Sequence, residues 1–274
     1  MNKAIVLLSG GQDSATCLYL ARTMFDEVHA VSIFYGQRHA AELESAQAVA
    51  RLAVVTHETI ALPVFGGIGG SDLTRTGTTI RGDGGQADAQ APGGLPTSFV
   101  PGRNALFLTL AAAVAVRAGA KDIVTGTCQT DYSGYPDCRR EFIDAQERAL
   151  TLAMPSSAGP IRIHTPLMYL NKAETVRLAR RLPGCWDALA LTLTCYEGRR
   201  PACGECPACT LRIRGFAEAG DVAALTRLLD AGQPVDTRDG NGRTALLVAT
   251  VAYQSNQQRK ARLAVLEPVL AACR

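Results

Sequence analysis

The chain has 274 residues and a formal net charge of +3; 47% of its residues are hydrophobic and 19% are charged. These values are typical of a globular protein, and the length suits one large domain or one domain with an appendage. So small a charge gives no argument for nucleic-acid binding, and no apolar run has the length of a membrane span or the pattern of a signal peptide. We therefore expect a cytoplasmic protein that does not enter the membrane.

The first expected elements are a buried parallel strand over 4–8 and a helix that starts near residue 15, joined by a glycine-rich turn. The turn reads Ser9-Gly10-Gly11-Gln12-Asp13-Ser14. Its backbone N–H groups and the positive end of the helix dipole favour an anion such as phosphate. The two serine hydroxyls can add donors, and Asp13 can cap the helix or approach a metal–phosphate unit. The order SGGxDS resembles the PP-loop of ATP pyrophosphatases; the alternative is a turn without a ligand.

Strands and helices continue to alternate along the chain. We expect strands over 27–34, within 54–62, at 123–126 and at 161–164, and helices over 40–52, 105–117, 140–154 and 171–182. This alternation predicts a parallel sheet with helices on both faces. Residues 66–96 are rich in glycine, and we expect a mobile loop there, either a lid over the nucleotide or a linker.

Polar side chains follow the ends of three expected strands. Ser9 follows the first strand, Tyr35 the second, and Asp131 the strand that begins at residue 123. Open α/β sheets bind ligands beyond the carboxyl ends of their strands. We therefore expect these three positions to converge on one crevice.

Four of the nine cysteines lie in one short window with the spacing C-x7-C-x2-C-x2-C. They are Cys195, Cys203, Cys206 and Cys209. Four thiolates suit tetrahedral zinc in a closed structural site, and Gly204 and Pro207 can assist the backbone bending that this spacing needs. The alternatives are four unligated thiols or an iron–sulfur cluster. Cys138 lies within the expected substrate loop, whereas four others lack a pattern and are expected to be buried apolar residues. These four are Cys17, Cys128, Cys185 and Cys273.

Six segments of the chain together carry a family resemblance. They are SGGQDS at 9–14, FYGQRH at 34–39, FVPGRN at 99–104, DYSGYPDCR at 131–139, TPLMYLNKAE at 165–174 and the CYEG…CGECPAC run at 195–209. In this order they resemble the QueC family of 7-cyano-7-deazaguanine synthases, over about residues 3–219. The resemblance implies a Rossmann-like PP-loop α/β domain over 1–218, a zinc module at about 185–214 within it, and a homodimer.

The resemblance also implies a reaction, in which 7-carboxy-7-deazaguanine, ammonia and ATP give the nitrile. A carboxylate is a poor electrophile, and transfer of AMP to its oxygen creates a good leaving group. Ammonia then gives an amide, and a second activation with loss of the amide oxygen gives the nitrile. Mg²⁺ would neutralise charge as pyrophosphate leaves, and the sequence dictates no general base.

Roles for single residues follow from residue type within the matching segments. The turn over 9–14 would bind the pyrophosphate end of ATP. Four residues are candidates for catalysis: Asp13 and the cations Arg38, Arg103 and Lys172, which could stabilise the transferred phosphate or the substrate carboxylate. The cations could instead hold the fold through ion pairs or lie on the surface. The candidates for substrate binding are Tyr35, Gln37, Arg103, Asn104, Asp131, Tyr132, Ser133, Tyr135 and Asp137.

Residues 219–274 extend beyond the family pattern. The segment Leu228-Leu229-Asp230-Ala231-Gly232, followed by Gly242-Arg243-Thr244-Ala245-Leu246, resembles an ankyrin repeat. So short a stack cannot bury its own apolar face, so we expect it to dock on the synthase domain, on another subunit or on a protein partner. It also motivates two alternative functions: conjugation of a deazaguanine to the amine of a protein or nucleic acid, and a nucleotide-binding scaffold without catalysis.

Overall fold

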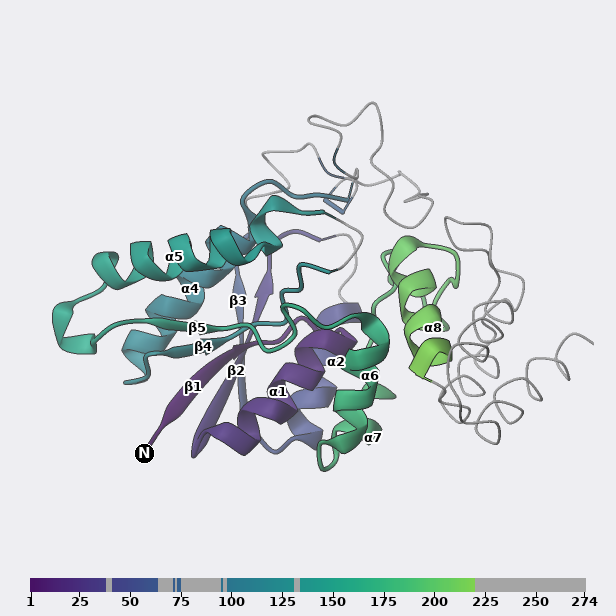
Figure 1. The fold of residues 1–274 in the computed structure, drawn as a ribbon, viewed down its shortest axis with the longest axis horizontal. Coiled ribbons are helices and arrows are strands. Elements are labelled where there is room, and N and C mark those ends of the chain that lie inside the picture. Colours follow the sequence, from purple (N-terminus) through teal and green to yellow (C-terminus); the bar gives the residue numbers. More distant parts are fainter. Residues whose placement is uncertain are drawn as a thin grey trace, which may run out of the picture.

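The computed structural model describes residues 1–37, 41–63, 71, 73–74, 95, 98–130 and 134–219. Within these ranges a five-stranded parallel sheet forms the centre of the fold, in the order β3-β2-β1-β4-β5 (Figure 1). The strands are β1 (Lys3–Leu7), β2 (Glu27–Phe34), β3 (Thr56–Ala61), β4 (Asp122–Val124) and β5 (Arg162–His164). The predicted parallel sheet is therefore confirmed.

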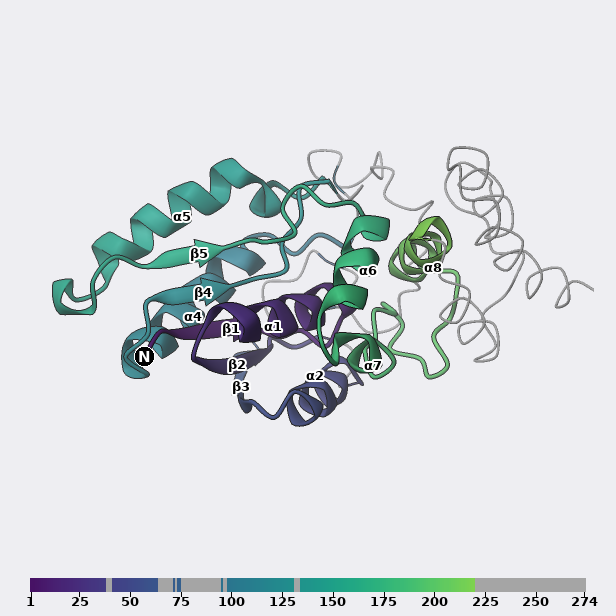
Figure 2. The ribbon, with the colours of Figure 1, turned by 60° about the horizontal axis from the view of Figure 1, so that its bottom comes forward.

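Helices cover both faces of this sheet, as Figures 1 and 2 show from two directions. One face carries α1 (Gln12–Met24), α2 (Ala41–Leu52), α6 (Lys172–Arg181) and α7 (Cys185–Leu189). The other face carries α4 (Arg103–Arg117) and α5 (Arg140–Ala153). Two 3-10 turns, η2 (Pro136–Cys138) and η3 (Ser156–Ala158), flank α5, and α8 (Pro207–Ala219) packs beside α6.

The central strand shows why two separate cores form. Successive side chains of a strand point to opposite faces, and β1 is buried on both sides. Ala4 and Val6 pack into the core beneath α1 and α2, whereas Ile5 packs into the core beneath α4 and α5. All three side chains have no exposed surface. The apolar run that follows the N-terminus thus specifies a central strand covered on both faces.

The strand order places the site. The chain moves outward from β1 through β2 to β3 and then returns to the other side of β1 to add β4 and β5. The direction of the connections therefore reverses between β1 and β4, and a crevice at the carboxyl ends of these strands is the expected ligand position.

Most predicted boundaries agree with the structure to within two residues. The strand over 27–34 is found as expected, while β4 ends at Val124 and not at residue 126. The start of α6 is fixed by a capping box, in which the Asn171 side chain accepts from the backbone N–H of Glu174 and Glu174 accepts from that of Asn171. The short helix α7 was not predicted. Among the helices in the described ranges, none combines the length and apolarity needed to cross a bilayer.

Candidate active site

A cavity of about 350 Å³ opens at the carboxyl ends of β1, β2 and β4. Its walls come from the turn after β1, the start of α2, the start of α4, the start of α6, and the segment around the cysteine cluster. The expected crevice is therefore present, and it is lined by segments that lie more than 200 residues apart in the sequence, from Leu7 to Arg212.

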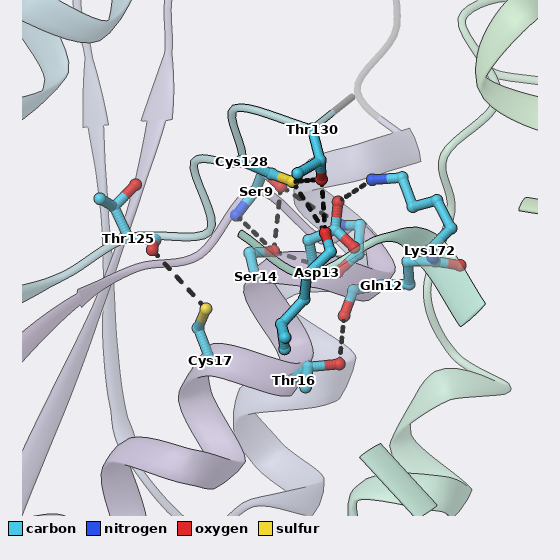
Figure 3. Close-up of polar contacts among 12 residues, drawn as sticks. Ser9, Gln12, Asp13, Ser14, Thr16, Cys17, Thr125, Cys128, Thr130 and Lys172 are labelled. Carbon is cyan, nitrogen blue, oxygen red and sulfur yellow. Dashed lines mark hydrogen bonds and ion pairs between the residues drawn. The ribbon is translucent and has the colours of Figure 1, made fainter. Parts of the chain in front are cut away.

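The glycine-rich turn closes on itself at the N-terminus of α1 (Figure 3). The Ser14 hydroxyl accepts from the backbone N–H of Ser9 at 3.2 Å and donates to the Gly11 carbonyl at 3.1 Å, and the Ser9 and Ser14 hydroxyls lie 3.0 Å apart. Gly11 is the N-cap of α1, and among the described residues no side chain caps this end. The first N–H groups of the helix are thus available to an anion.

Gly10 is required by space and by backbone conformation. Its φ is +90°, which favours glycine, and a Cβ at this position would lie 2.1 Å from the backbone oxygen of Glu42 in α2. The absence of a side chain therefore lets the turn pack directly against the first turn of α2. This contact gives Gly10 a structural role beside the phosphate-binding role expected for the turn.

Asp13 forms an ion pair and does not cap its helix. Its Oδ2 lies 2.5 Å from Nζ of Lys172 at the start of α6, and the two side chains are 24% and 16% exposed (Figure 3). The other carboxylate oxygen, Oδ1, is buried without a hydrogen-bond partner in the described part of the chain, and so are both amide atoms of Gln12. Buried polar atoms are seldom left unpaired, so these three atoms mark a place for a polar ligand or a cation.

Another part of the wall comes from the chain just after β2, from the start of α4 and from the residue before η2. The Arg103 guanidinium donates to the Tyr35 hydroxyl at 3.5 Å and lies 5.8 Å from the centre of the Tyr35 ring. Burial raises the pKa of Tyr35, so its hydroxyl stays protonated at neutral pH. The Tyr135 hydroxyl is bound to Ser98 at 2.6 Å, and Tyr135 also lines the cavity. This part of the cavity, formed by Arg103, Tyr35 and Tyr135 and called the far end below, therefore combines one cation with aromatic rings.

Other predicted substrate residues have different positions. Asn104 and Gln37 line the cavity, and the Gln37 amide oxygen accepts from the backbone N–H of Tyr35 at 2.9 Å. Asp137 instead serves the fold, because its carboxylate accepts from the backbone N–H of Asn104 in the first turn of α4 at 3.1 Å. Burial raises the pKa of this carboxyl group. Four predicted site residues lie outside the described residues. They are Arg38, Asp131, Tyr132 and Ser133.

Two charged residues line the cavity that sequence analysis did not select. Glu42 stands in the first turn of α2, where burial raises its pKa to about 7 although Arg103 opposes the shift. Arg212 comes from α8, and burial lowers its pKa to about 10, so it remains charged at neutral pH. For Arg212 the sequence offers one indication of a role in the site, because the residue lies three positions after Cys209 and so is linked to the cysteine cluster. For Glu42 the sequence offers no such indication.

The four clustered cysteines meet as predicted. Their Sγ atoms all lie within 4.8 Å of one another, and those of Cys203 and Cys209 are 3.9 Å apart. A tetrahedron of sulfur atoms about 2.3 Å from a central zinc ion has edges of about 3.8 Å. Gly204 has a φ of +77° and Pro207 is the first residue of α8, which confirms the bending expected at both positions.

The cluster also carries the polar contacts that thiolate ligands use. Backbone N–H groups point at three of the sulfur atoms: Tyr196 to Cys206 at 3.4 Å, Cys203 to Cys195 at 3.4 Å, and Cys206 to Cys203 at 3.3 Å. Hydrogen bonds from neighbouring thiols lower the pKa of Cys195, and the same interaction raises that of Cys206 to about 12. Four thiolates this close together would repel one another without a cation among them, and the cluster could hold a metal such as zinc.

The remaining cysteines fall into two groups. Cys17 and Cys185 are fully buried in the core, and burial raises the pKa of both, as expected for apolar packing residues. Cys128 is buried but also lines the cavity, where Cys138 lies too. Cys273 lies outside the described residues.

A parallel α/β sheet with the turn SGGxDS between its central strand and first helix defines a PP-loop protein that uses ATP. A family model described as "Queuosine biosynthesis protein QueC" matches residues 3–220. The chain belongs to this family, so the resemblance given by its six segments is confirmed.

Individual relatives agree with this assignment. The chain is 52% identical over 220 residues to a 7-cyano-7-deazaguanine synthase of Chromobacterium violaceum, a match that covers 80% of this chain and 90% of the relative. A synthase of the same name from Laribacter hongkongensis is 52% identical over 217 residues, covering 79% and 91%. Among solved structures, the U34-tRNA thiolase NcsA of Methanococcus maripaludis has a TM-score of 0.43 at 13% identity, covering 92% of this chain and 71% of that one. That likeness is too distant to bear on function.

Proposed function

We propose that this chain converts 7-carboxy-7-deazaguanine, ammonia and ATP into 7-cyano-7-deazaguanine, the product for which its relatives are named. The observation that carries the proposal is that one cavity is lined by the glycine-rich turn over 9–14 and by a group of residues that combines Arg103 with aromatic rings. A nucleotide and a planar anionic substrate need these two ends respectively. The first product would be an acyl adenylate and pyrophosphate, as the carboxylate oxygen attacks the α-phosphorus of ATP.

At the phosphate end, the start of α1 with Ser9 and Ser14 would hold the pyrophosphate portion of ATP. Lys172 is close enough to Asp13 to stay fixed at this end, where it would offset the charge that builds on the transferred phosphate. The unpaired Oδ1 of Asp13 fits a ligand of Mg²⁺. Bound Mg²⁺ would neutralise negative charge on the departing pyrophosphate.

At the other end, Arg103 would orient the substrate carboxylate, and the ring of Tyr35 or Tyr135 would bound the deazaguanine plane. Ammonia attacks the acyl carbon and AMP leaves, which gives the amide. The amide oxygen then attacks the α-phosphorus of a second ATP and releases pyrophosphate, and loss of AMP together with two protons from nitrogen gives the nitrile. Both activations involve an oxygen on the same carbon, so one site suffices for both.

We further propose zinc for the cysteine centre. The separations of the sulfur atoms fit a single tetrahedral ion, whereas a cluster of several iron atoms would hold its cysteines further apart. Zinc would cross-link the segment before α8 to the start of that helix. Its role would be structural, because all four positions around it would be filled by sulfur.

The domain boundary near residue 218 is also a proposal, supported by the end of the family match at residue 220. The ankyrin-like segment lies outside the described residues. Of the lid expected within 66–96, only residues 71, 73–74 and 95 are described. A homodimer, a protein partner for the C-terminal extension and a cytoplasmic location stay predictions.

The test of this function is turnover of 7-carboxy-7-deazaguanine with ATP, Mg²⁺ and ¹⁵N-ammonium, read by mass spectrometry. We expect a nitrile that carries the label, formed with two AMP per product. Asp13→Asn should lower the rate by about 100-fold or more, because it removes the charge that pairs with Lys172 and that would help to hold Mg²⁺. Asp144→Asn, on α5 and 64% exposed, is the matched control. Consumption of ATP without any labelled nitrile would contradict the proposal.

A further inference from the structure

Arg212 is a cation in the wall of the cavity. Its guanidinium donates to the Thr192 hydroxyl at 2.7 Å and to the Leu189 carbonyl at 2.9 Å, both uncharged groups. It also lies 5.4 Å from the centre of the Phe216 ring. Within the described ranges no carboxylate forms an ion pair with it. Two of its five N–H donors are thus used within the described residues, and a guanidinium with further donors beside a cavity is suited to bind an anion.

Its position is at the phosphate end of the cavity. Arg212, Asp13 and Lys172 all line this cavity. Thr192, which accepts from Arg212, directly precedes Leu193, whose backbone N–H donates to the Gly10 carbonyl of the glycine-rich turn at 2.9 Å. α8 also approaches α6 very closely, because a Cβ on Gly215 would lie 2.7 Å from Cβ of Lys172. The lysine at the start of α6 and the arginine of α8 therefore come from two helices in contact.

The cysteine cluster and the bonds of Arg212 hold the same piece of chain. Cys209 and Arg212 are three residues apart on α8, so they lie on neighbouring turns of one face. The hydrogen-bond partners of Arg212, at Leu189 and Thr192, lie just before Cys195. The cluster thus joins the two segments between which the guanidinium is bonded.

We propose that Arg212 is an additional residue of the nucleotide site, which binds the pyrophosphate portion of ATP and is positioned there by the cysteine centre. This rests on the proposed use of ATP but not on the identity of the second substrate. The cysteine module would then contribute a cation to catalysis, in addition to its structural role. A bidentate guanidinium suits a phosphate better than a lysine would.

Binding of magnesium pyrophosphate and of ATP to the full-length, zinc-loaded chain tests this, measured by calorimetry without the deazaguanine substrate. Arg212→Gln should weaken pyrophosphate binding at least tenfold and ATP binding to a similar extent. Arg214→Gln, on the same helix and paired with Glu218, is the matched control and should bind as the unaltered chain does. Zinc content and melting temperature are measured on each variant, so that a folding defect is recognised.

A second variant keeps the charge of Arg212 and removes one of the hydrogen bonds that position it. Thr192→Val removes the 2.7 Å bond to Arg212, and we expect pyrophosphate binding to weaken three- to tenfold with zinc content unchanged. If the Arg212→Gln protein does not fold, Thr192→Val becomes the variant that decides the test. Unchanged pyrophosphate affinity in whichever of the two folds with its zinc would overturn the proposal. If the unaltered chain binds pyrophosphate but forms no nitrile, the proposed synthase function is wrong while the proposal for Arg212 still stands.

Discussion

The two ends of the cavity are built in different ways. The phosphate end uses one contiguous turn, the start of α1 and an ion pair between two helix starts, Asp13 and Lys172. The far end brings together side chains from a strand end, from α2, from α4 and from η2, among them Arg103 and Tyr35, which are hydrogen-bonded to each other. The phosphate end therefore depends on backbone groups and close packing together with charged side chains, whereas the far end depends on side chains alone.

This difference indicates how each end should respond to mutation. A substitution within the turn over 9–14 should act through geometry and abolish nucleotide binding as a whole. A substitution at the far end should act on one substrate and leave ATP binding largely intact. The variants below separate these two behaviours.

Gly10→Ala should have the largest effect. The new Cβ would overlap the backbone oxygen of Glu42, and the residue would keep a φ near +90°, so the turn or α2 must move. We expect a loss of about 3 kcal/mol in unfolding free energy and no measurable ATP binding. Gly119→Ala is the control: its φ is +67°, but no described atom lies within 4 Å of the added Cβ, so it should cost about 1 kcal/mol and leave turnover intact. Tight ATP binding by Gly10→Ala would show that the turn is less constrained than its packing indicates.

Cys203→Ser should have the next largest effect, because it removes a ligand from the proposed zinc centre. We expect the variant to lose its metal, and hydrogen exchange to rise over 195–219 while the strands of the sheet stay protected. Nitrile formation should fall by at least about 100-fold, since this segment forms one cavity wall. Cys185→Ser changes a fully buried thiol outside the cluster and should keep its metal. Full metal content in Cys203→Ser would argue against a four-cysteine site.

Arg103→Met should affect one substrate more than the other. It removes the cation at the far end, so kcat/KM for 7-carboxy-7-deazaguanine should fall by about 100-fold while the affinity for ATP changes little. Arg117→Met lies on the same helix, is 63% exposed at its side chain and should leave both parameters unchanged. Equal losses for both substrates would mean that Arg103 also serves the phosphate end.

The sequence predicts the phosphate end well because its parts are contiguous. The turn over 9–14 combines strand, glycines, hydroxyls and helix start in one motif, so its chemistry follows from local structure alone. The cysteine centre is predictable for the same reason, since its spacing limits the geometry. The capping box at Asn171 likewise fixes the start of α6 and hence the position of Lys172.

The far end depends on tertiary packing that no local pattern encodes. Asp137 belongs to the same motif as Tyr135, yet its carboxylate is used at the N-terminus of α4 and not in the cavity. Glu42 looks like any acidic residue in the first turn of a helix until packing places it beside Arg103. At the phosphate end, Arg212 depends on tertiary packing in the same way, because α8 carries it to the cavity by lying so close to α6.

Glu42→Gln should have the smallest effect and should depend on pH. Burial raises the pKa of Glu42 from 4.5 to about 7, opposed by Arg103 and aided by Cys195, so the folded state favours the protonated form. Stability from this preference is complete below pH 4.5 and is lost as pH rises through 7. At pH 8 the unaltered chain must bury a charged carboxylate and the variant need not, so we expect the unfolding free energy of the variant to be higher by about 2 kcal/mol. This is less than the full pKa shift of Glu42 implies, because its side chain is partly exposed. Denaturant titrations at pH 5 and pH 8 measure this, and Glu44→Gln, exposed on the same helix, is the control. If the variant and the unaltered chain differ in unfolding free energy by the same amount at both pH values, the carboxyl group of Glu42 does not titrate in this range. The charge of the far end would then be constant between pH 5 and pH 8.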